Sequence, residues 1–309
     1  MSQPSKPSFP PGLTRRQFSA TALAAGLAVS AGLARAQQPL PILRIVESGH
    51  SLTDGVIEPL RGMINAAGGR GTTLLKSTVP GSPIEIRWKD PSASPDLRLP
   101  EVMAQYDVMV NTERVSLSTT FEAHDSRGYA LKFFDHAWKY GRDGKGAASL
   151  LYSTWVSISS GPEYDNPYKD EDGLIPFRER LDREAVQWEA ILDYVNQNRP
   201  QGSPAMKMIP GTQIMAAAHD EIGAGKAGGM SEFRELFRDD IHVSDWGGYL
   251  IALAHFAVIY NRDPRGLPHG VPAKGGTSPE QAAWMQDLVW RVVSSYPRAG
   301  TDGSGVLDY

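Results

Sequence analysis

The chain has 309 residues, of which 41% are hydrophobic and 21% charged, a composition typical of a globular protein with one substantial core. Its formal net charge of −4, with no cluster of lysine and arginine, argues against a nucleic-acid-binding surface. Because the sequence contains no cysteine, disulfides, cysteine-ligated metal centres, a thiol nucleophile and a lipid-anchored cysteine are excluded.

Residues 1–36 have the three features of an export signal. They contain no acidic residue, and the adjacent Arg15 and Arg16 precede an alanine-rich apolar run and an Ala-x-Ala pattern ending at Ala36. The run is too short to span a membrane stably, so we expect no membrane anchor. Paired arginines before such a run resemble a bacterial twin-arginine signal. We therefore expect the twin-arginine translocase to export a single domain, residues 37–309, to the periplasm or the medium.

A buried strand followed by a helix is predicted around residues 45–55, which read IVESGHSLTDG. The apolar run 41–46 is typical of a strand, and from Val56 the apolar residues take helical spacing. Ser51 lies between the two, where its backbone N–H would face the positive end of the helix dipole. Two roles fit Ser51 at this point: the N-cap of the helix, or a nucleophile.

Strands and helices alternate along the rest of the chain. A Gly/Thr-rich connection follows the first helix; further strands are predicted at 84–88, 106–110, 147–158 and 206–210, helices at 129–140, 177–196, 246–260 and 279–295, and loops at 91–100 and 160–175. Such alternation without repeats predicts an α/β fold, a doubly wound parallel sheet covered by helices on both faces. In such sheets the ligand binds beyond the carboxyl ends of the strands, where Ser51 would lie.

A second group of reactive side chains lies at 239–248, DDIHVSDWGG, in a predicted loop that leads into a helix. An aspartate three residues before a histidine on a turn can reach the imidazole Nδ1. That contact fixes the tautomer and stabilises the imidazolium that forms after proton abstraction. Asp239 and His242 have this spacing, although a surface loop with an incidental histidine would look the same locally.

Together, the two segments resemble blocks of the SGNH, or GDSL, hydrolase family. GHSLTDG at 49–55 is similar to the first block of the family, with His50 in place of the usual aspartate, and DDIH at 239–242 is similar to the last block, D-x-x-H. The resemblance implies a three-layer, flavodoxin-like sheet. It also implies that Ser51 is the nucleophile, His242 the general base and Asp239 the carboxylate that orients it.

The resemblance also suggests three donors for an oxyanion hole. The backbone N–H of Ser51 is the first, and the N–H of Gly81 would be the second, although a turn alone would account for that glycine. The third block of the family, G-x-N-D, is altered in this chain. Asn111 would be the side-chain donor, with Thr112 as the alternative.

Trp155 falls near the end of a predicted strand, where its ring could stack on a sugar or pack in the core. No metal-ligand spacing such as H-E-x-x-H occurs, so we expect neither metal nor cofactor. The sequence therefore predicts a secreted serine esterase that hydrolyses a small acyl ester, best an acetyl ester, of a small molecule or a carbohydrate. Two alternatives stay open: an O-acyltransferase of the same fold that modifies a glycan, and a catalytically disabled glycan-binding protein.

Overall fold

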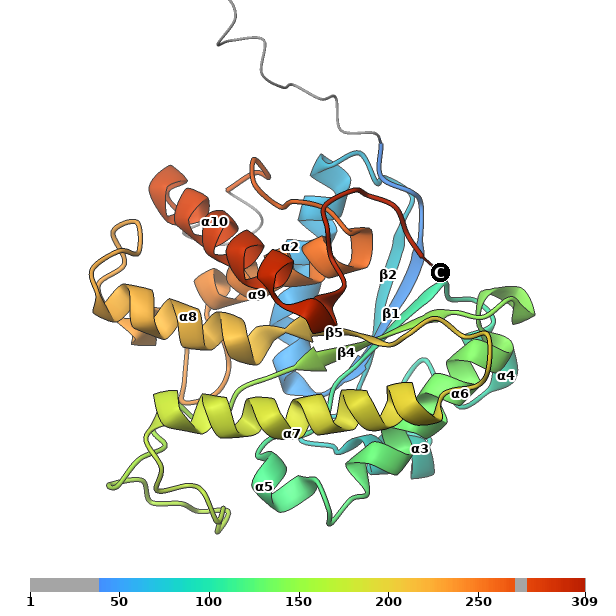
Figure 1. The fold of residues 1–309 in the computed structure, drawn as a ribbon, viewed down its shortest axis with the longest axis horizontal. Helices are drawn as coiled ribbons and strands as arrows, with labels where there is room; N and C mark the ends of the chain where they lie inside the picture. The colour runs from blue at the N-terminus through green and yellow to red at the C-terminus, as the bar shows by residue number, and fades with distance from the viewer. Residues whose placement is uncertain (1–38, 270–276, 309) are drawn as a thin grey trace, which may run out of the picture. The chain divides into compact units, whose positions relative to one another are not determined.

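The computed structural model describes residues 39–269 and 277–308, so the expected export signal lies outside the described residues. The described residues form a parallel sheet of five strands in the order β2-β1-β3-β4-β5, which crosses the centre of Figure 1. The strands are β1 (Arg44–Gly49), β2 (Thr73–Thr78), β3 (Val108–Asn111), β4 (Ala148–Ser153) and β5 (Lys207–Pro210). This order is that of flavodoxin-like doubly wound sheets, so the predicted fold class is confirmed.

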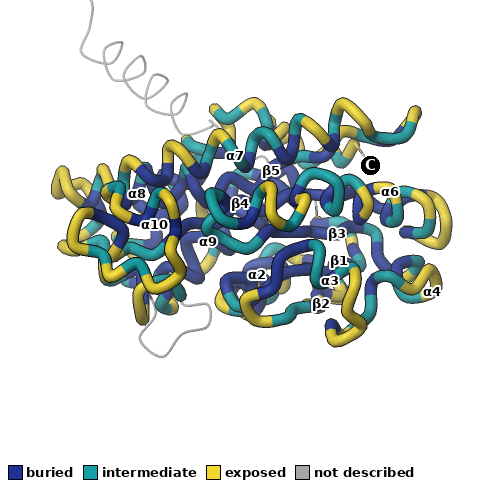
Figure 2. The backbone as a smooth tube through the Cα atoms, turned by 90° about the horizontal axis from the view of Figure 1, so that it is seen from below, coloured by how far each residue is buried: buried dark blue, intermediate teal, exposed yellow. Residues whose placement is uncertain are grey.

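Helices cover both faces of the sheet, and strands β1, β3, β4 and β5 run through the buried centre in Figure 2, with the partly exposed β2 at one edge. One face packs mainly against α2 (Ser51–Ala66), α8 (Gly211–Gly223), α9 (Asp245–Tyr260) and α10 (Pro279–Ser295). The other face packs against α3 (Ile84–Lys89), α4 (Pro100–Met103), α5 (Leu117–Thr120), α6 (Ser126–Gly144) and α7 (Phe177–Asn198). The described part of the chain also contains two short 3-10 helices, η1 (Phe233–Leu236) and η2 (Pro297–Ala299). Within the described ranges, no helix combines the length and the apolar character needed to cross a membrane.

The structure corrects two of the predicted elements, which adjoin each other in the chain. The Gly/Thr-rich connection contains β2, an edge strand whose polar residues and exposed Leu75 hide its periodicity. The predicted strand 84–88 is instead α3, which begins after Pro83. Its buried residues are Ile84 and Arg87, three apart, which is helical spacing. The alternation of apolar and polar residues there was too short to distinguish a strand from a helical turn.

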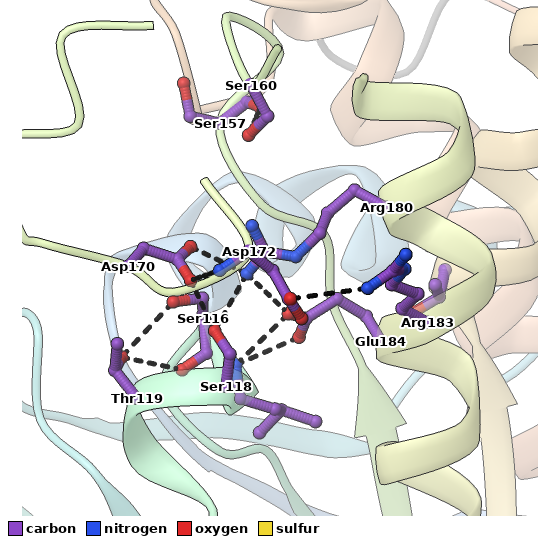
Figure 3. Close-up of polar contacts among 12 residues, drawn as sticks. Ser116, Ser118, Thr119, Ser157, Ser160, Asp170, Asp172, Arg180, Arg183 and Glu184 are labelled. Atoms are coloured by element: carbon purple, nitrogen blue, oxygen red, sulfur yellow. Dashed lines mark hydrogen bonds and ion pairs between the residues drawn. The ribbon is translucent and has the colours of Figure 1, made fainter. Parts of the chain in front are cut away.

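A buried ionic cluster anchors the long loop between β4 and α7 (Figure 3). Arg180, on α7, is fully buried, and its Nη2 donates to Asp170 Oδ2 at 2.6 Å and to Glu184 Oε1 at 3.0 Å. The same nitrogen donates to Ser118 Oγ of α5 at 3.0 Å, and the Glu184 carboxylate accepts from the backbone N–H of Leu117. Burial raises the pKa of Glu184 to about 7, while the Arg180 charge acts to lower it. The loop is thus joined to two helices through one guanidinium.

Replacing Arg180 with methionine should lower the free energy of unfolding by about 3–5 kcal/mol, because two buried carboxyl groups lose their cation. Urea unfolding checks this value. Arg183→Met on the same helix is the control, since its side chain is 53% exposed and pairs with Asp172 and Glu179. Its loss should stay below about 1 kcal/mol. Equal losses in the two variants would contradict the role assigned to the cluster.

Candidate active site

Ser51 is the first residue of α2, directly beyond the carboxyl end of β1. The N-cap is His50, whose Nδ1 accepts from the backbone N–H of Leu52 at 3.4 Å. Of the two roles that the sequence left open for Ser51, the cap therefore belongs to its neighbour. The Ser51 hydroxyl does not cap the helix and instead contacts a side chain from a distant part of the sequence.

That contact is His242, 191 residues away in the sequence. The Nε2 atom of His242 lies 2.9 Å from Ser51 Oγ, and its Nδ1 lies 2.9 Å from Asp239 Oδ2. The three side chains form a continuous Asp–His–Ser chain with the geometry of a hydrolytic triad. The structure thus brings together the three residues that the sequence analysis selected from two distant segments.

The geometry of the turn at 238–242, called the Asp-His turn below, explains why Asp239 faces the imidazole. Asp239 Oδ1 accepts from the backbone N–H groups of Ile241 at 2.9 Å and His242 at 2.7 Å, which leaves Oδ2 beside the imidazole. Partial burial acts to raise the pKa of Asp239, but these backbone hydrogen bonds and the His242 side chain lower it to about 2. Asp240 instead pairs with Arg234 at 2.9 Å. The carboxylate beside His242 is therefore ionised at neutral pH.

Close packing of α9 against α2 places the Asp-His turn next to Ser51. The turn closes with an antiparallel bridge between Phe237 and Val243, and α9 begins two residues later. A Cβ atom at Gly248 of α9 would lie only 2.5 Å from the carbonyl oxygen of Gly55 in α2. A glycine at position 248 therefore allows the two helices to approach closely near their N-termini, beside Ser51 on α2 and the Asp-His turn that precedes α9.

The three expected oxyanion donors lie at the same edge of the sheet but differ in exposure. The N–H of Ser51 is at the N-terminus of α2, where the helix dipole favours negative charge. Gly81 is exposed in the turn after β2, with φ of +64°, two residues beyond Val79, whose N–H donates to the Gly49 carbonyl at 3.0 Å. Asn111 ends β3 and is buried, and its Nδ2 has no hydrogen-bond partner among the described residues.

A buried polar layer behind the site was not found from the sequence. Arg87 of α3 is 2% exposed and donates to Asn111 Oδ1 at 3.1 Å, to Ser48 Oγ at 3.2 Å and to the carbonyl of Thr112. The hydrogen bond from the guanidinium fixes the orientation of the Asn111 side-chain amide. Its Nδ2 is therefore available to donate a hydrogen bond to a substrate oxygen. The signal was present in the sequence, since an arginine three residues after Ile84 would share its buried face if the segment were helical.

Of the two roles that the sequence left open for Trp155, the structure shows packing in the core and not stacking on a sugar. Its side chain is fully buried, and its Nε1 donates to the backbone carbonyl of Ile241 at 2.8 Å. The ring meets Phe237 edge to face, with centroids 6.0 Å apart. No face of the indole is open to a sugar, so Trp155 belongs to the core.

The burial of His50 predicts a pH dependence of stability. Burial lowers the pKa of His50 to about 4, helped by the charges of Arg87, His242 and Arg114 and opposed by the hydrogen bond of its Nε2 to the Glu113 carbonyl. Between pH 6.5 and 4 the unfolded chain binds a proton here that the folded protein does not. The free energy of unfolding is therefore complete above pH 6.5 and falls as the pH is lowered toward 4.

His50→Asn keeps a capping side chain and removes this titration. We expect the loss of stability between about pH 7 and pH 4 to be smaller in the variant by up to roughly 3 kcal/mol. Urea unfolding at both pH values measures the difference. His255, whose pKa burial also lowers to about 4, accounts for part of the dependence that remains. The same pH dependence in the variant and the wild type would contradict the assignment.

No protein-family model matches the chain, and no curated protein matches it. Among solved structures, a DUF4886 family protein from Bacteroides uniformis is similar over 85% of this chain and 98% of its own, with a TM-score of 0.60 and 15% identity. A candidate SGNH hydrolase from Slackia heliotrinireducens matches over 70% of this chain and 97% of its own, with a TM-score of 0.43 and 16% identity. The lipase Lip_vut3 from a goat rumen metagenome covers 70% and 96%, with a TM-score of 0.38 and 15% identity. The likeness to the Bacteroides protein shows that the two chains share a three-layer α/β fold.

Proposed function

We propose that the protein is a serine hydrolase of the SGNH type that cleaves a carboxylic ester. One observation carries this proposal: the chain of contacts from Asp239 through His242 to Ser51, with both links at 2.9 Å. Ser51 is placed at a helix N-terminus, where negative charge developing on a substrate oxygen is stabilised. A serine nucleophile, a general base and an orienting carboxylate are the groups that perform acyl transfer in such sites.

In the proposed reaction, Ser51 Oγ attacks the ester carbonyl carbon while His242 Nε2 takes the hydroxyl proton. The N–H groups of Ser51 and Gly81, with the Asn111 amide, hold the oxyanion of the tetrahedral intermediate. The intermediate collapses, the C–O bond to the alcohol breaks, and His242 returns the proton to the leaving oxygen. Water then attacks the acyl-enzyme, with His242 again as base, and the carboxylic acid is released.

We propose an acetyl ester of a carbohydrate as the substrate class. The loop 160–175, which follows β4 at the carboxyl edge of the sheet, is polar, and its Tyr168 is 84% exposed. An exposed aromatic ring among polar groups suits a sugar, because one face stacks while the neighbours donate and accept hydrogen bonds. Tyr168 thus offers the stacking surface that the buried Trp155 cannot.

A panel of esters tests this function. Aryl acetates, aryl octanoates and an acetylated polysaccharide are assayed with the wild type, Ser51→Ala and Tyr168→Ala. We expect acetyl esters to be preferred, and Tyr168→Ala to raise KM for the polysaccharide but not for the aryl acetate. A preference for octanoyl esters would indicate a lipase-like acyl pocket, since each buried CH₂ contributes about 0.8 kcal/mol. Sustained acetyl transfer to a glycan in water would indicate an acyltransferase instead.

Export by the twin-arginine route is a further part of the proposal, supported by Arg15, Arg16 and the apolar run after them. Changing both arginines to lysine should leave the precursor in the cytoplasm. Cell fractionation with an antibody to the protein measures this, and the protein without residues 1–36 serves as the size marker. Export of the double variant at the normal rate would contradict the proposed route.

A further inference from the structure

We propose that Trp155 is a positioning residue, whose indole fixes the Asp-His turn at the distance from Ser51 that proton transfer needs. The inference rests on the proposed hydrolase function and deepens it. It starts from two hydrogen bonds that cross from the end of β4 to the Asp-His turn. Trp155 Nε1 donates to the carbonyl of Ile241 at 2.8 Å, and the backbone N–H of Ile158 donates to the carbonyl of Asp240, also at 2.8 Å.

These two bonds add to the hydrogen bonds that the Asp-His turn makes within itself. Within the turn, the N–H groups of Ile241 and His242 both donate to Asp239, and the N–H of Arg238 donates to the carbonyl of His242 at 3.0 Å. The carbonyls of Asp240 and Ile241 accept hydrogen bonds from the segment after β4. Since Ile241 directly precedes His242, rotation of its peptide group would move the imidazole relative to Ser51.

The donor itself is rigid. Trp155 is fully buried, and its ring lies edge to face against Phe237 at 6.0 Å and Tyr152 at 6.5 Å. Phe237 in turn pairs with Val243 at the base of the Asp-His turn. The indole therefore contacts the turn through its N–H and, through its ring, contacts Phe237 directly before the turn.

The backbone that carries Ile158 is also held in place. The Ser160 hydroxyl donates to the carbonyl of Ser157 at 2.7 Å, and the N–H of Phe177, the first residue of α7, donates to the carbonyl of Ser160 at 3.1 Å. Farther along the loop, Arg180 binds Asp170 in the buried cluster of Figure 3. A hydrogen-bonded path thus runs from α7 to the Asp-His turn. Positioning of this kind matters because a displacement of about 1 Å in a reacting group can lower a rate by about 10²-fold.

Trp155→Phe tests the inference, because it removes the N–H donor and keeps an aromatic ring against Phe237. Trp188→Phe is the matched control: Trp188 is also fully buried, and its Nε1 has no hydrogen-bond partner among the described residues.

Active sites are titrated with a fluorophosphonate, and kcat per titrated site and KM are measured with an aryl acetate. We expect Trp155→Phe to lower kcat per site roughly tenfold or more at unchanged KM, and Trp188→Phe to change neither. A merely structural tryptophan would lower the number of titratable sites and leave kcat per site unchanged.

Amide hydrogen exchange over residues 237–244 provides a readout that needs no activity. Exchange there should be faster in Trp155→Phe than in the wild type and unchanged in Trp188→Phe. Wild-type exchange and kcat in Trp155→Phe, or equal changes in both variants, would overturn the inference. If the wild type neither hydrolyses esters nor reacts with the fluorophosphonate, the proposed function fails, and the exchange data still decide whether Trp155 holds the Asp-His turn.

Discussion

Ser51→Ala is expected to lower kcat for an aryl acetate by roughly 10⁵–10⁶-fold, to the level left by binding and oxyanion stabilisation alone. Alanine removes the Oγ atom that lies 2.9 Å from His242 Nε2, so no acyl-enzyme can form. The fold should persist because His50, not Ser51, caps α2. Steady-state kinetics on protein purified from a host without background esterase gives the measurement.

Ser278→Ala is the control for this variant, because Ser278 caps α10 through its Oγ and has no part in the site. We expect it to lower the free energy of unfolding by about 1 kcal/mol and to leave kcat unchanged. Ser51→Ala should thus lose activity but keep its stability, and Ser278→Ala should lose stability but keep its activity. Substantial hydrolysis by Ser51→Ala would show that another group performs the attack.

Asp239→Asn is expected to lower kcat by roughly 10²–10⁴-fold, because the imidazolium formed during attack loses its anion and the neutral ring loses its preferred tautomer. The turn itself should survive, since the Asn side-chain oxygen can still accept from the N–H groups of Ile241 and His242. The loss would then report on electrostatics and tautomer, not on a displaced loop. The measurement is kcat per titrated site.

Asp240→Asn is the matched control, one residue along the chain. Its carboxylate is 55% exposed and pairs with Arg234, so its removal should change kcat by less than about twofold. A damaging Asp240→Asn beside a silent Asp239→Asn would mean that the orienting carboxylate has been assigned to the wrong residue.

The elements that the sequence predicted well have either a clear helical period or a long apolar run. Helix α7 buries Leu181, Trp188 and Ile191 at helical spacing, whereas α9 is apolar and buried all the way from Gly247 to Tyr260, so both were predicted close to their observed bounds. The edge strand β2 and the short helix α3 were not. An edge strand is half solvated and a helix of six residues is hardly longer than one turn, so neither leaves enough periodic positions to read.

In the candidate site, too, some residues could be predicted from the sequence and others could not. Ser51, His242 and Asp239 could be selected because each lies in a short local pattern whose chemistry is recognisable. The supporting contacts could not, because they join segments that are distant in the sequence. The indole of Trp155 meets Ile241 86 residues away, and Arg87 meets Asn111 24 residues away. Such pairs depend on the tertiary arrangement, in which the strand order brings the ends of β1, β3 and β4 together and the packing of α3 and of the loop before α9 adds Arg87 and Ile241.

Peptide mapping after reaction with a fluorophosphonate tests the central claim most directly, because the reagent marks a serine only where a neighbouring base activates it. The wild type is treated, digested and analysed by mass spectrometry, with Ser51→Ala and a known serine hydrolase treated in parallel. The triad predicts a single adduct per chain, located on Ser51, and none in the variant. An adduct on a different serine, or an unmodified wild type under conditions that label the known hydrolase, would contradict the assignment of this protein as a serine hydrolase acting through Ser51.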